Sequence, residues 1–436
     1  MHILFLSDNF PPETNAPAHR TWDHVREWTE KGHQVTVITC APNFPRGEVF
    51  PGYKNRLWQR ETLEGVEIIR VWTYIAANAG FAPRILDYLS FMTASFLAGL
   101  FVRRPDAVVA TSPQFFTAVA GWALSKLRRR PFVFELRDLW PETILAVDAM
   151  RAGVLVRCLE GLARFLYRQA DLMVPVTRAF ERHLIEEGVA PERIAVVTNG
   201  IDPDAFRPGG DSSAMRARIS LREDAFCVAY VGTLGLCHQL GTVLDAAAAS
   251  RNDPSIGYVL MGDGADREEI RRRIEEEQLD NVRLLDAAPR DEALKLLSAA
   301  DASLVLLRNS PVFETVIPSK IFEAMALEKP ILLGVRGEAH RIVVDEAQCG
   351  LPVEPEDPQA LLRAIRRLQE NPEEAQRLGS AGRAELESHY RRSDLAARFL
   401  SELTTRFGGE ATRNLPAAES EPTEPSKPAP PNSGSQ

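Results

Sequence analysis

The sequence lacks several features that would place it in particular classes of protein. Its 436 residues include only five cysteines, and no two of them form a C-x-x-C pair. Most of these cysteines lie in or beside apolar runs, so we expect buried free thiols in a reducing compartment. No D-x-D-like pair of carboxylates stands at the end of an expected strand. We therefore expect no bound metal and no resident cofactor.

An excess of positive charge and a membrane-spanning run are also missing. The net charge is −9, which argues against a general nucleic-acid-binding protein. No apolar run is long enough to cross a bilayer as a helix. The opening MHILFLSDNFPPE has no basic region and only a short apolar run, so it indicates a first strand and not a signal peptide. We expect a cytoplasmic protein.

Alternation of strand-like and helix-like segments runs through most of the chain. Residues 2–40 follow a strand–loop–helix–strand pattern, and a second such opening begins near residue 226. The segment TNGIDPDAFRPGGDSS between them is rich in Gly, Pro, Asp and Ser, which is typical of a domain boundary. The pattern predicts an α/β protein with two doubly wound halves. We place the domains at 1–200 and 223–387, with a linker at 201–222.

The stretch PSKIFEAMALEKPILLGV, residues 318–335, is the most informative part of the sequence. An apolar run precedes it, and Ser319 stands where a helix N-cap belongs. Phe322, Met325 and Ala326 are spaced for one buried helical face. The whole unit is therefore predicted as strand–loop–helix–strand. In such units ligands collect at the carboxyl ends of strands, beside helix N-termini.

Lys320 and Glu323 share a face in the first turns of that predicted helix. A carboxylate there can accept two hydrogen bonds from adjacent hydroxyls, such as those of a ribose, and a lysine can meet a phosphate. The spacing alone favours a simpler interpretation, in which Glu323 complements the helix dipole and Lys320 is solvated.

Other candidate ligand-binding residues lie at further predicted strand ends. The first loop has no G-x-G-x-x-G, so a dinucleotide site is not supported. Asn15 and Arg20 lie where this loop meets its helix, although a surface arginine is the commoner outcome. Arg137 and Asp138 follow the strand 132–136, as ligand-binding residues or as a structural ion pair. The loop 232–241 precedes a helix, so its backbone N–H groups are candidates for binding phosphate.

The segment LDYLSFMTASFLAGLFVRRP, residues 86–105, permits two interpretations. It can form a buried helix, or it can lie in a membrane interface with Arg103 and Arg104 near lipid phosphates. The pattern favours the buried helix. After residue 408 the chain has few core-forming residues, and we expect a disordered tail.

These motifs together resemble the retaining glycosyltransferases of family 4. The segments SDNFPPETN, EKGHQVTVIT, TNGIDPDAF, VGTLG, GDG and PSKIFEAMALEKP match in order. FMTASFLAGL, VVATSPQFF and FELRDLWPET are similar to the branch that makes bacterial surface polysaccharides, including N-acetyl-fucosamine transferases. The resemblance implies the GT-B fold, with two Rossmann-like domains facing across a cleft. It also implies that a C-terminal helix, at 388–407, returns to the N-terminal domain.

The resemblance also implies roles for individual residues. Glu323 matches the second glutamate of a Glu-x7-Glu motif and would hold the donor ribose. The first glutamate falls at Thr315, with Glu314 one residue earlier, so either the loop bulges to present Glu314 or Thr315 and the backbone hold the donor sugar. Arg137 and Asp138 take the place of a catalytic histidine by position only.

The donor diphosphate has fewer matching residues. The usual Arg and Lys of the phosphate site are replaced by Thr233 and by His238 or Gln239, which leaves Lys320 as the nearest positive charge. Further donor contacts fall in the turn and at the base edge, on Gly232, Thr233, Gly235, Ala287 and Ala288. Asn15 and Arg20 lie on the acceptor side.

The implied function is transfer of a sugar from a UDP-sugar, with retention and without a metal. The acceptor is a saccharide or a polyprenyl-diphosphate-linked sugar, in pathways such as lipopolysaccharide or O-antigen synthesis. The enzyme would work in the cytoplasm or on the inner membrane surface, and no nucleic acid is expected. Two alternatives stay open: a GT-B epimerase of UDP-sugars and a non-catalytic sugar-nucleotide-binding protein.

Overall fold

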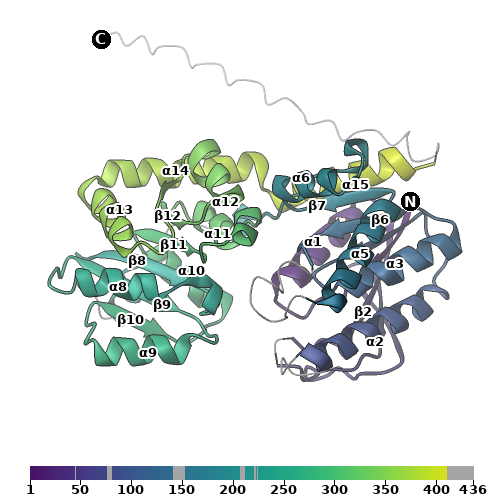
Figure 1. Ribbon diagram of the computed structural model, residues 1–436, viewed down its shortest axis with the longest axis horizontal. Coiled ribbons are helices and arrows are strands. Elements are labelled where there is room, and N and C mark those ends of the chain that lie inside the picture. Colours follow the sequence, from purple (N-terminus) through teal and green to yellow (C-terminus); the bar gives the residue numbers. More distant parts are fainter. Residues whose placement is uncertain are drawn as a thin grey trace, which may run out of the picture.

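The protein folds into two α/β domains that follow each other along the chain (Figure 1). The computed structural model describes residues 1–44, 46–75, 81–140, 153–206, 212–219, 222 and 224–409. Within these residues there is one sheet of seven strands and one of six. The predicted α/β class with two doubly wound domains is confirmed.

The N-terminal sheet is mostly parallel and buried. Its order is β3-β4-β2-β1-β5-β6-β7, and only β3 runs antiparallel to its neighbour. The inner strands are near-continuous apolar runs because helices cover both faces. The polar strand β3, WQRETL, takes the edge. The elements are β1 (His2–Leu6), α1 (Ala16–Glu30), β2 (Gln34–Cys40), β3 (Trp58–Leu63), β4 (Val66–Val71), α2 (Phe81–Gly99), β5 (Ala107–Thr111), α3 (Phe115–Arg128), β6 (Phe132–Leu136), α5 (Val154–Gln169), β7 (Leu172–Pro175) and α6 (Arg178–Glu186).

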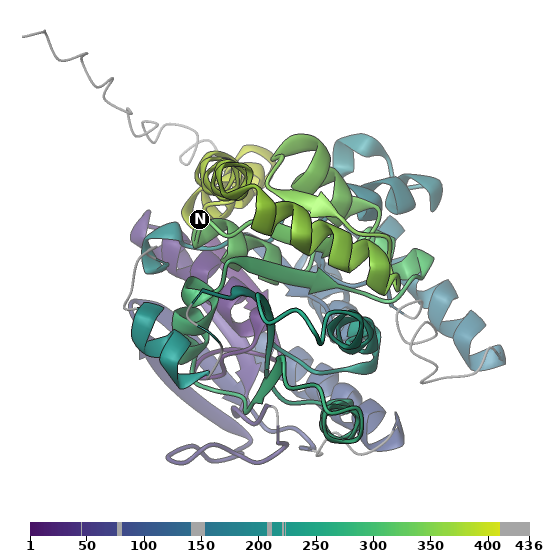
Figure 2. The ribbon, with the colours of Figure 1, turned by 90° about the vertical axis from the view of Figure 1, so that its left-hand side faces the viewer.

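The C-terminal sheet is parallel, in the order β10-β9-β8-β11-β12-β13. Separate hydrophobic clusters lie on its two faces, one under α8, α9 and α13 and the other under α10, α11 and α14. Figure 2, viewed from this domain, shows the helices around the sheet. The elements are α7 (Ser212–Arg218), β8 (Phe226–Val231), α8 (Gly241–Ala249), β9 (Ile256–Met261), α9 (Arg267–Glu276), β10 (Val282–Leu285), α10 (Arg290–Ala299), β11 (Ala302–Leu306), η4 (Pro311–Thr315), α11 (Lys320–Ala326), β12 (Ile331–Gly334), α12 (Glu338–His340), β13 (Gly350–Pro352), α13 (Pro358–Glu370), α14 (Pro372–His389) and α15 (Arg392–Phe407).

Each sheet has a point where the strand order reverses, and ligands bind at such points in open α/β sheets. In the N-terminal sheet it lies between β1 and β5, and in the C-terminal sheet between β8 and β11. In Figure 1 the purple loops after β1 and β2 lie on the side of their domain that is turned toward the C-terminal domain. The topology therefore predicts that a ligand binds to residues that follow these strands.

Helix α15 returns to the N-terminal domain, as the resemblance implied. Trp28 of α1 donates from Nε1 to the carbonyl of Ala396 at 2.9 Å, and its ring packs edge-on against Phe399. At the start of α15, Arg392 pairs with Asp23 of α1 at 2.7 Å. The last helix thus belongs to the hydrophobic core of the first domain.

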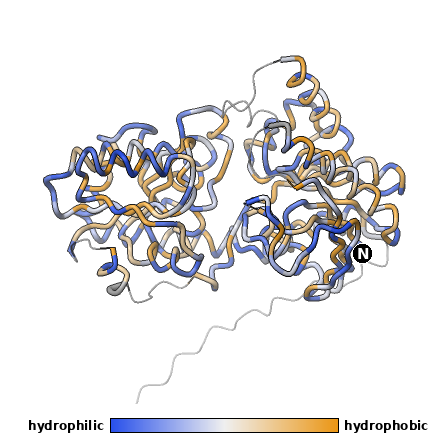
Figure 3. Tube along the Cα trace, turned by 90° about the horizontal axis from the view of Figure 1, so that it is seen from below, coloured by the Kyte–Doolittle hydropathy of each residue, from blue (hydrophilic) through white to orange (hydrophobic). Residues whose placement is uncertain are grey.

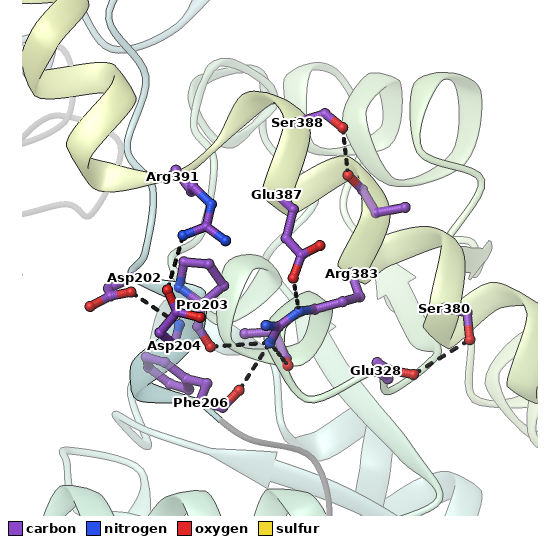
Figure 4. A network of polar contacts seen from close by, with 12 residues as sticks. Asp202, Pro203, Asp204, Phe206, Glu328, Ser380, Arg383, Glu387, Ser388 and Arg391 are labelled. Carbon is purple, nitrogen blue, oxygen red and sulfur yellow. Dashed lines mark hydrogen bonds and ion pairs between the residues drawn. The ribbon is translucent and has the colours of Figure 1, made fainter. Parts of the chain in front are cut away.

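The chain that connects the domains is held by one arginine of α14 (Figure 4). Nη1 of Arg383 donates to the carbonyls of Pro203, Phe206 and Ala326 at 3.1, 3.0 and 2.8 Å. Because Ala326 is the last residue of α11, this contact fixes the linker against the helix that carries Lys320 and Glu323.

Some local predictions change in the structure. Ser319 is the N-cap residue of α11, but its side chain accepts no capping hydrogen bond because its backbone is already helical, with φ −59° and ψ −25°. After β12 and α12 the chain passes through a π-helical turn at Arg341–Glu346 into the short strand Gly350–Pro352. The predicted tail lies outside the described residues from 410 onward.

Helix α2 packs one face into the N-terminal core, as the buried-helix interpretation of residues 86–105 predicts, and leaves other side chains exposed. Phe91 and Ala98 are buried, whereas Leu86 and Leu97 are half exposed. Figure 3, in which the trace is coloured by hydropathy, shows hydrophobic stretches in both domains.

Candidate functional site

Helix α11 follows the carboxyl end of β11, beside the point where the C-terminal sheet reverses. Phe322, Met325 and Ala326 are buried, as their spacing predicts. Lys320 and Glu323 remain half-buried on the other side of the helix. The packing of one face thus determines where these two charged side chains lie.

Lys320 lies against the glycine turn after β8. Its Nζ is 4.9 Å from the centre of the Tyr230 ring, a cation–π contact. A Cβ atom on Gly232 would lie only 2.7 Å from the same Nζ. Burial lowers the pKa of Lys320, opposed by the charge of Glu323. The structure therefore brings the predicted phosphate lysine and the predicted phosphate turn together.

The backbone of this turn divides its N–H groups between two uses. The amides of Gly232 and Leu234 donate to the carbonyls of Met261 and Asp263, both at 2.9 Å. The amides of Thr233 and Gly235 have no acceptor among the described residues. Of these four amides, those of Thr233 and Gly235 are therefore free to bind an anion. Gly232 contributes its backbone conformation and leaves room for Lys320, but its N–H is already used.

Glu323 is half-buried, and the positive charges that act on it come from its own helix, from α10 and from α15. Burial raises the pKa of its carboxyl, opposed by the positive charges of Lys320, Arg290 and Arg392. Arg290 begins α10, and Arg392 begins α15 on the first domain. In the described parts of the chain no group donates a hydrogen bond to this carboxylate, so its acceptor capacity is unused.

The predicted sugar contacts, Thr315 and Glu314, belong to the 3₁₀ turn η4 before α11. The Thr315 hydroxyl donates to the carbonyl of Val312 at 2.7 Å, so its proton is used within the turn. Glu314 lines a small cavity together with Arg308. Ala287 and Ala288 lie after β10 on the same edge of the sheet, with Ala287 exposed.

Arg137 and Asp138 lie at the carboxyl end of β6 above a buried ionic cluster. Burial lowers the pKa of Arg137 to about 10. Its Nε and Nη1 atoms are buried and have no hydrogen-bond partner among the described residues. Beneath it lies Glu135, where burial would raise the pKa, but Arg20, His24 and Arg137 lower it to about 2.

The two residues expected on the acceptor side, Asn15 and Arg20, have different surroundings in the structure. Asn15 caps α1, accepts from the amide of Ala18 at 2.9 Å and lines a cavity after β1. Arg20 does not line that cavity. Its Nε donates to Glu135 at 2.8 Å, and its Nη atoms donate to the carbonyls of Val197 and Thr198 at 2.8 and 2.6 Å. Arg20 is therefore a buried residue that fixes the end of the first domain, and it is not the surface arginine that was the commoner expectation.

Comparison with known proteins gives the family. A model described as glycosyl transferase 4-like domain matches residues 15–200, and one described as glycosyl transferases group 1 matches residues 211–385. The chain pairs the two domains of a GT-B glycosyltransferase. The putative colanic acid biosynthesis glycosyl transferase WcaI of Escherichia coli is 25% identical over 376 residues, which cover 84% of this chain and 91% of WcaI.

Other relatives and structures agree with this assignment. The probable glycosyltransferase WbjE of Pseudomonas aeruginosa is 26% identical over 261 residues, covering 59% of this chain and 64% of WbjE. Sucrose-phosphate synthase from Thermosynechococcus elongatus superposes with a TM-score of 0.71 at 19% identity, covering 93% and 99% of the two chains. Anabaena Alr3699/HepE in complex with UDP and glucose gives 0.68 at 18%, covering 92% and 99%. At these identities the structures show the fold.

Several site residues of this glycosyltransferase escaped the sequence-based reasoning. Arg290 and Arg392 converge on Glu323 from separate elements, and no spacing links them. A cavity of about 310 Å³ after β1, β2 and β4 is lined by the carboxylates of Asp8, Glu13 and Asp87. Within the described residues no cluster of His, Cys, Asp and Glu has the arrangement of a metal site.

Proposed function

We propose that this GT-B glycosyltransferase moves a sugar from a UDP-linked donor to a saccharide or lipid-linked acceptor in bacterial surface-polysaccharide synthesis. The transferred sugar is an N-acetylated hexosamine or deoxyhexosamine, and its anomeric configuration is retained. The relative named for colanic acid biosynthesis, and the HepE structures with UDP, support this class of reaction. The reaction takes place at the cytoplasmic face of the inner membrane.

The observation that carries the proposal is the position of Glu323. Its carboxylate has free acceptor capacity, lies three residues after the turn-facing Lys320, and feels the positive charges of Arg290 and Arg392. A ribose presents two adjacent hydroxyl donors, which match a carboxylate with two free oxygens. In this arrangement Glu323 binds the ribose and leaves the diphosphate at Lys320.

Bond cleavage needs stabilisation of the departing diphosphate. The electron pair of the bond between the sugar C1 and oxygen goes to that phosphate oxygen, where negative charge develops. In this proposal the ammonium of Lys320 and the free amides of Thr233 and Gly235 stabilise that charge. Fixed donors aimed at a developing charge lower the barrier because they need no rearrangement during the reaction.

A groove beside α2 supports a lipid-linked acceptor. It has a volume of about 610 Å³ and is lined mainly by apolar side chains of α2 and of the chain around β3 and β4, including Trp58, Trp72 and Leu97. Leu57 and Phe101 at this groove are 81% and 75% exposed. Apolar area of this extent is unusual on a protein surface without a partner. Among the described helices none is long and apolar enough to cross a membrane.

The decisive assay is UDP release from a panel of UDP-sugars, with and without a polyprenyl-diphosphate-linked sugar. A transferase releases UDP faster when the acceptor is present. An epimerase interconverts the UDP-sugars and releases no UDP. A non-catalytic protein binds UDP and changes neither substrate. The last two results would each overturn the proposal.

The ribose role of Glu323 has its own test. Glu323→Gln removes the charge with little change of shape, and we expect the KM for the UDP-sugar to rise by about tenfold or more, since a hydrogen bond to a charged group is worth about 1.5–3 kcal/mol. The matched control is Glu328→Gln, an exposed residue in the turn just after the same helix. Equal KM values in the two variants would remove the role.

A further inference from the structure

The two domains contact each other where α6 of the first domain meets the 3₁₀ turn η4 and the short helix α12 of the second. Val316, the residue after η4, packs against hydrophobic clusters of both domains, and α6 contributes Phe180 and Leu184 to the N-terminal cluster. Figure 1 shows α6 and α12 on the sides of the two domains that face each other. The turn with the proposed sugar contacts therefore lies at a contact between domains.

An ion pair joins the domains at this contact. Nη2 of Arg182, on α6, donates to Oε1 of Glu338 at 3.1 Å, and Nη2 of Arg341 donates to Oε2 at 2.9 Å. The Glu338 side chain is only 1% exposed, whereas that of Arg182 is 63% exposed. An exposed ion pair contributes little, but a buried carboxylate that loses a partner keeps an uncompensated charge. The pair therefore matters mainly for Glu338 and for the segment that carries it.

This segment lies directly against η4. Gly337 has a φ of +69°, and a Cβ atom there would overlap with the carbonyl group of Glu314. The turn η4 is thus held between α12 of its own domain and α6 of the other domain. Packed interiors transmit displacements because they contain few voids. A shift of the domain contact therefore moves Glu314 and Thr315, the two residues expected to contact the donor sugar.

The residues proposed for the nucleotide are held by other contacts. Lys320 lies on the ring of Tyr230, and the buried face of α11 packs in the core of the C-terminal domain. Arg383 binds the last carbonyl of α11. Within the described residues, the side-chain hydrogen bonds and ion pairs of α6 do not involve Lys320 or Glu323. The ion pair therefore acts on the sugar part of the donor site.

We propose that Arg182 and Glu338 are positioning residues, which hold η4 across the domain contact so that Glu314 and Thr315 meet the transferred sugar. The inference rests on the proposed function. Neither residue touches the donor, and both act through η4. The N-terminal domain thus sets the geometry of a sugar site that lies in the C-terminal domain. Small displacements are important here, because a misplacement of about 1 Å can reduce a rate about 100-fold.

The test compares UDP with UDP-N-acetylglucosamine on the full-length protein, with both affinities measured by calorimetry. Arg182→Met removes the N-terminal partner at an exposed position and keeps an unbranched side chain. We expect the affinity for UDP to stay the same and that for UDP-N-acetylglucosamine to fall about threefold or more, as for one lost hydrogen bond. Equal losses for the two nucleotides, or no loss of either, overturn the positioning role.

Two further variants separate this role from a general loss of charge. Arg182→Lys keeps a positive donor for Glu338, so we expect it to restore most of the affinity for UDP-N-acetylglucosamine. Arg157→Met is the matched control, because Arg157 is exposed on α5 and forms no ion pair among the described residues. It should bind both nucleotides like the parent protein. A lysine variant as weak as Arg182→Met would contradict the proposal.

Glu338→Gln tests the same contact from the C-terminal domain. We expect the same selective loss, and little further loss when Arg182→Met is added, because both changes remove one interaction. Additive losses overturn the proposal. Urea denaturation shows whether Glu338→Gln folds, and if it does not, the Arg182 variants decide alone.

The parent protein separates the two levels of the argument. If it fails to bind UDP, or fails to bind UDP-N-acetylglucosamine, the proposed function fails and the inference falls with it. If it binds both and Arg182→Met behaves like Arg157→Met, only the positioning role fails.

Discussion

The side-chain nitrogen of Lys320 occupies the space that a side chain at Gly232 would need. A Cβ atom on Gly232 would lie 2.7 Å from Lys320 Nζ and 2.8 Å from its Cε, and Gly232 has a φ of +135°. Only glycine adopts this backbone conformation easily. The turn after β8 and the first residue of α11 therefore depend on each other, although they are far apart in the sequence.

Gly232→Ala should disturb the donor site first. The added methyl group displaces the Lys320 ammonium, and the strained backbone costs about 1–3 kcal/mol of folding free energy. We expect the KM for the UDP-sugar to rise and the midpoint of urea unfolding to fall. Steady-state kinetics and chemical denaturation measure the two effects.

Gly235→Ala is the matched control within the same turn. Gly235 has a φ of −117°, and its Cβ atom would make only an ordinary contact of 3.5 Å with Thr233. We expect both KM and stability to stay close to those of the parent protein. If the two alanine variants behave alike, the proposed contact of Lys320 with Gly232 does not matter for donor binding.

Lys320→Met should lower kcat more than it changes stability. The methionine stem still packs on Tyr230, but the charge that would face the departing diphosphate is lost. Removal of one such stabilising group costs about 100–1,000-fold in kcat. The control Lys295→Met removes an exposed lysine from α10 and should leave kcat unchanged. A Lys320 variant with full kcat would show that another group stabilises the leaving phosphate.

Much of the fold and part of the site could be predicted because they depend on local patterns. The apolar strands, the buried face of α11 and the pair Lys320–Glu323 all follow from residues a few positions apart. The cavity residues Asp8 and Glu13 lie in the loop after β1 and Asp87 lies in α2, so no local spacing brings all three together. Their raised pKa values depend on burial, which the sequence does not display.

A buried cationic partner for Glu135 could have been predicted from the sequence, although not its identity. Glu135 is the one charged residue in the apolar strand FVFEL, and it is fully buried. A charge in a buried strand requires an opposite charge or several hydrogen bonds nearby. That signal pointed to a buried arginine somewhere in the chain. It could not select Arg20, because the partners lie more than a hundred positions apart.

Arg20→Met should therefore destabilise the protein and leave the acceptor KM of the folded fraction unchanged. Breaking one side of a buried ion pair costs about 3–5 kcal/mol because the remaining charge is uncompensated. The carbonyls of Val197 and Thr198 also lose their donors. Denaturation curves measure the loss. An acceptor KM that rises in the intact protein would restore the ligand-contact role.

Arg26→Met on the same helix is the control for this substitution. Arg26 is exposed for 41% of its side chain and forms only a long pair with Glu30 at 3.7 Å. Such surface pairs contribute about 0–1 kcal/mol, so the variant should unfold almost like the parent.

His24 should make the protein less stable as the pH falls below the ordinary histidine pKa. Burial lowers the pKa of His24 from 6.5 to about 3, opposed by the nearby Glu135 carboxylate. Between these values the unfolded chain binds a proton that the folded chain does not, so acid favours unfolding. The free energy of unfolding should fall by up to about 1.4 kcal/mol per pH unit through this group.

His24→Phe should flatten that dependence between pH 6.5 and 4.5, because it removes the titrating group while an aromatic ring remains between Trp28 and Phe399. The lower limit is chosen because Glu135, whose pKa of about 2 lies below the ordinary 4.5, begins to contribute in the same direction only at lower pH. Urea denaturation at several pH values gives the slope. His389→Asn, at an exposed histidine, should keep the parent slope. If His24→Phe also keeps it, acid sensitivity arises outside the buried cluster.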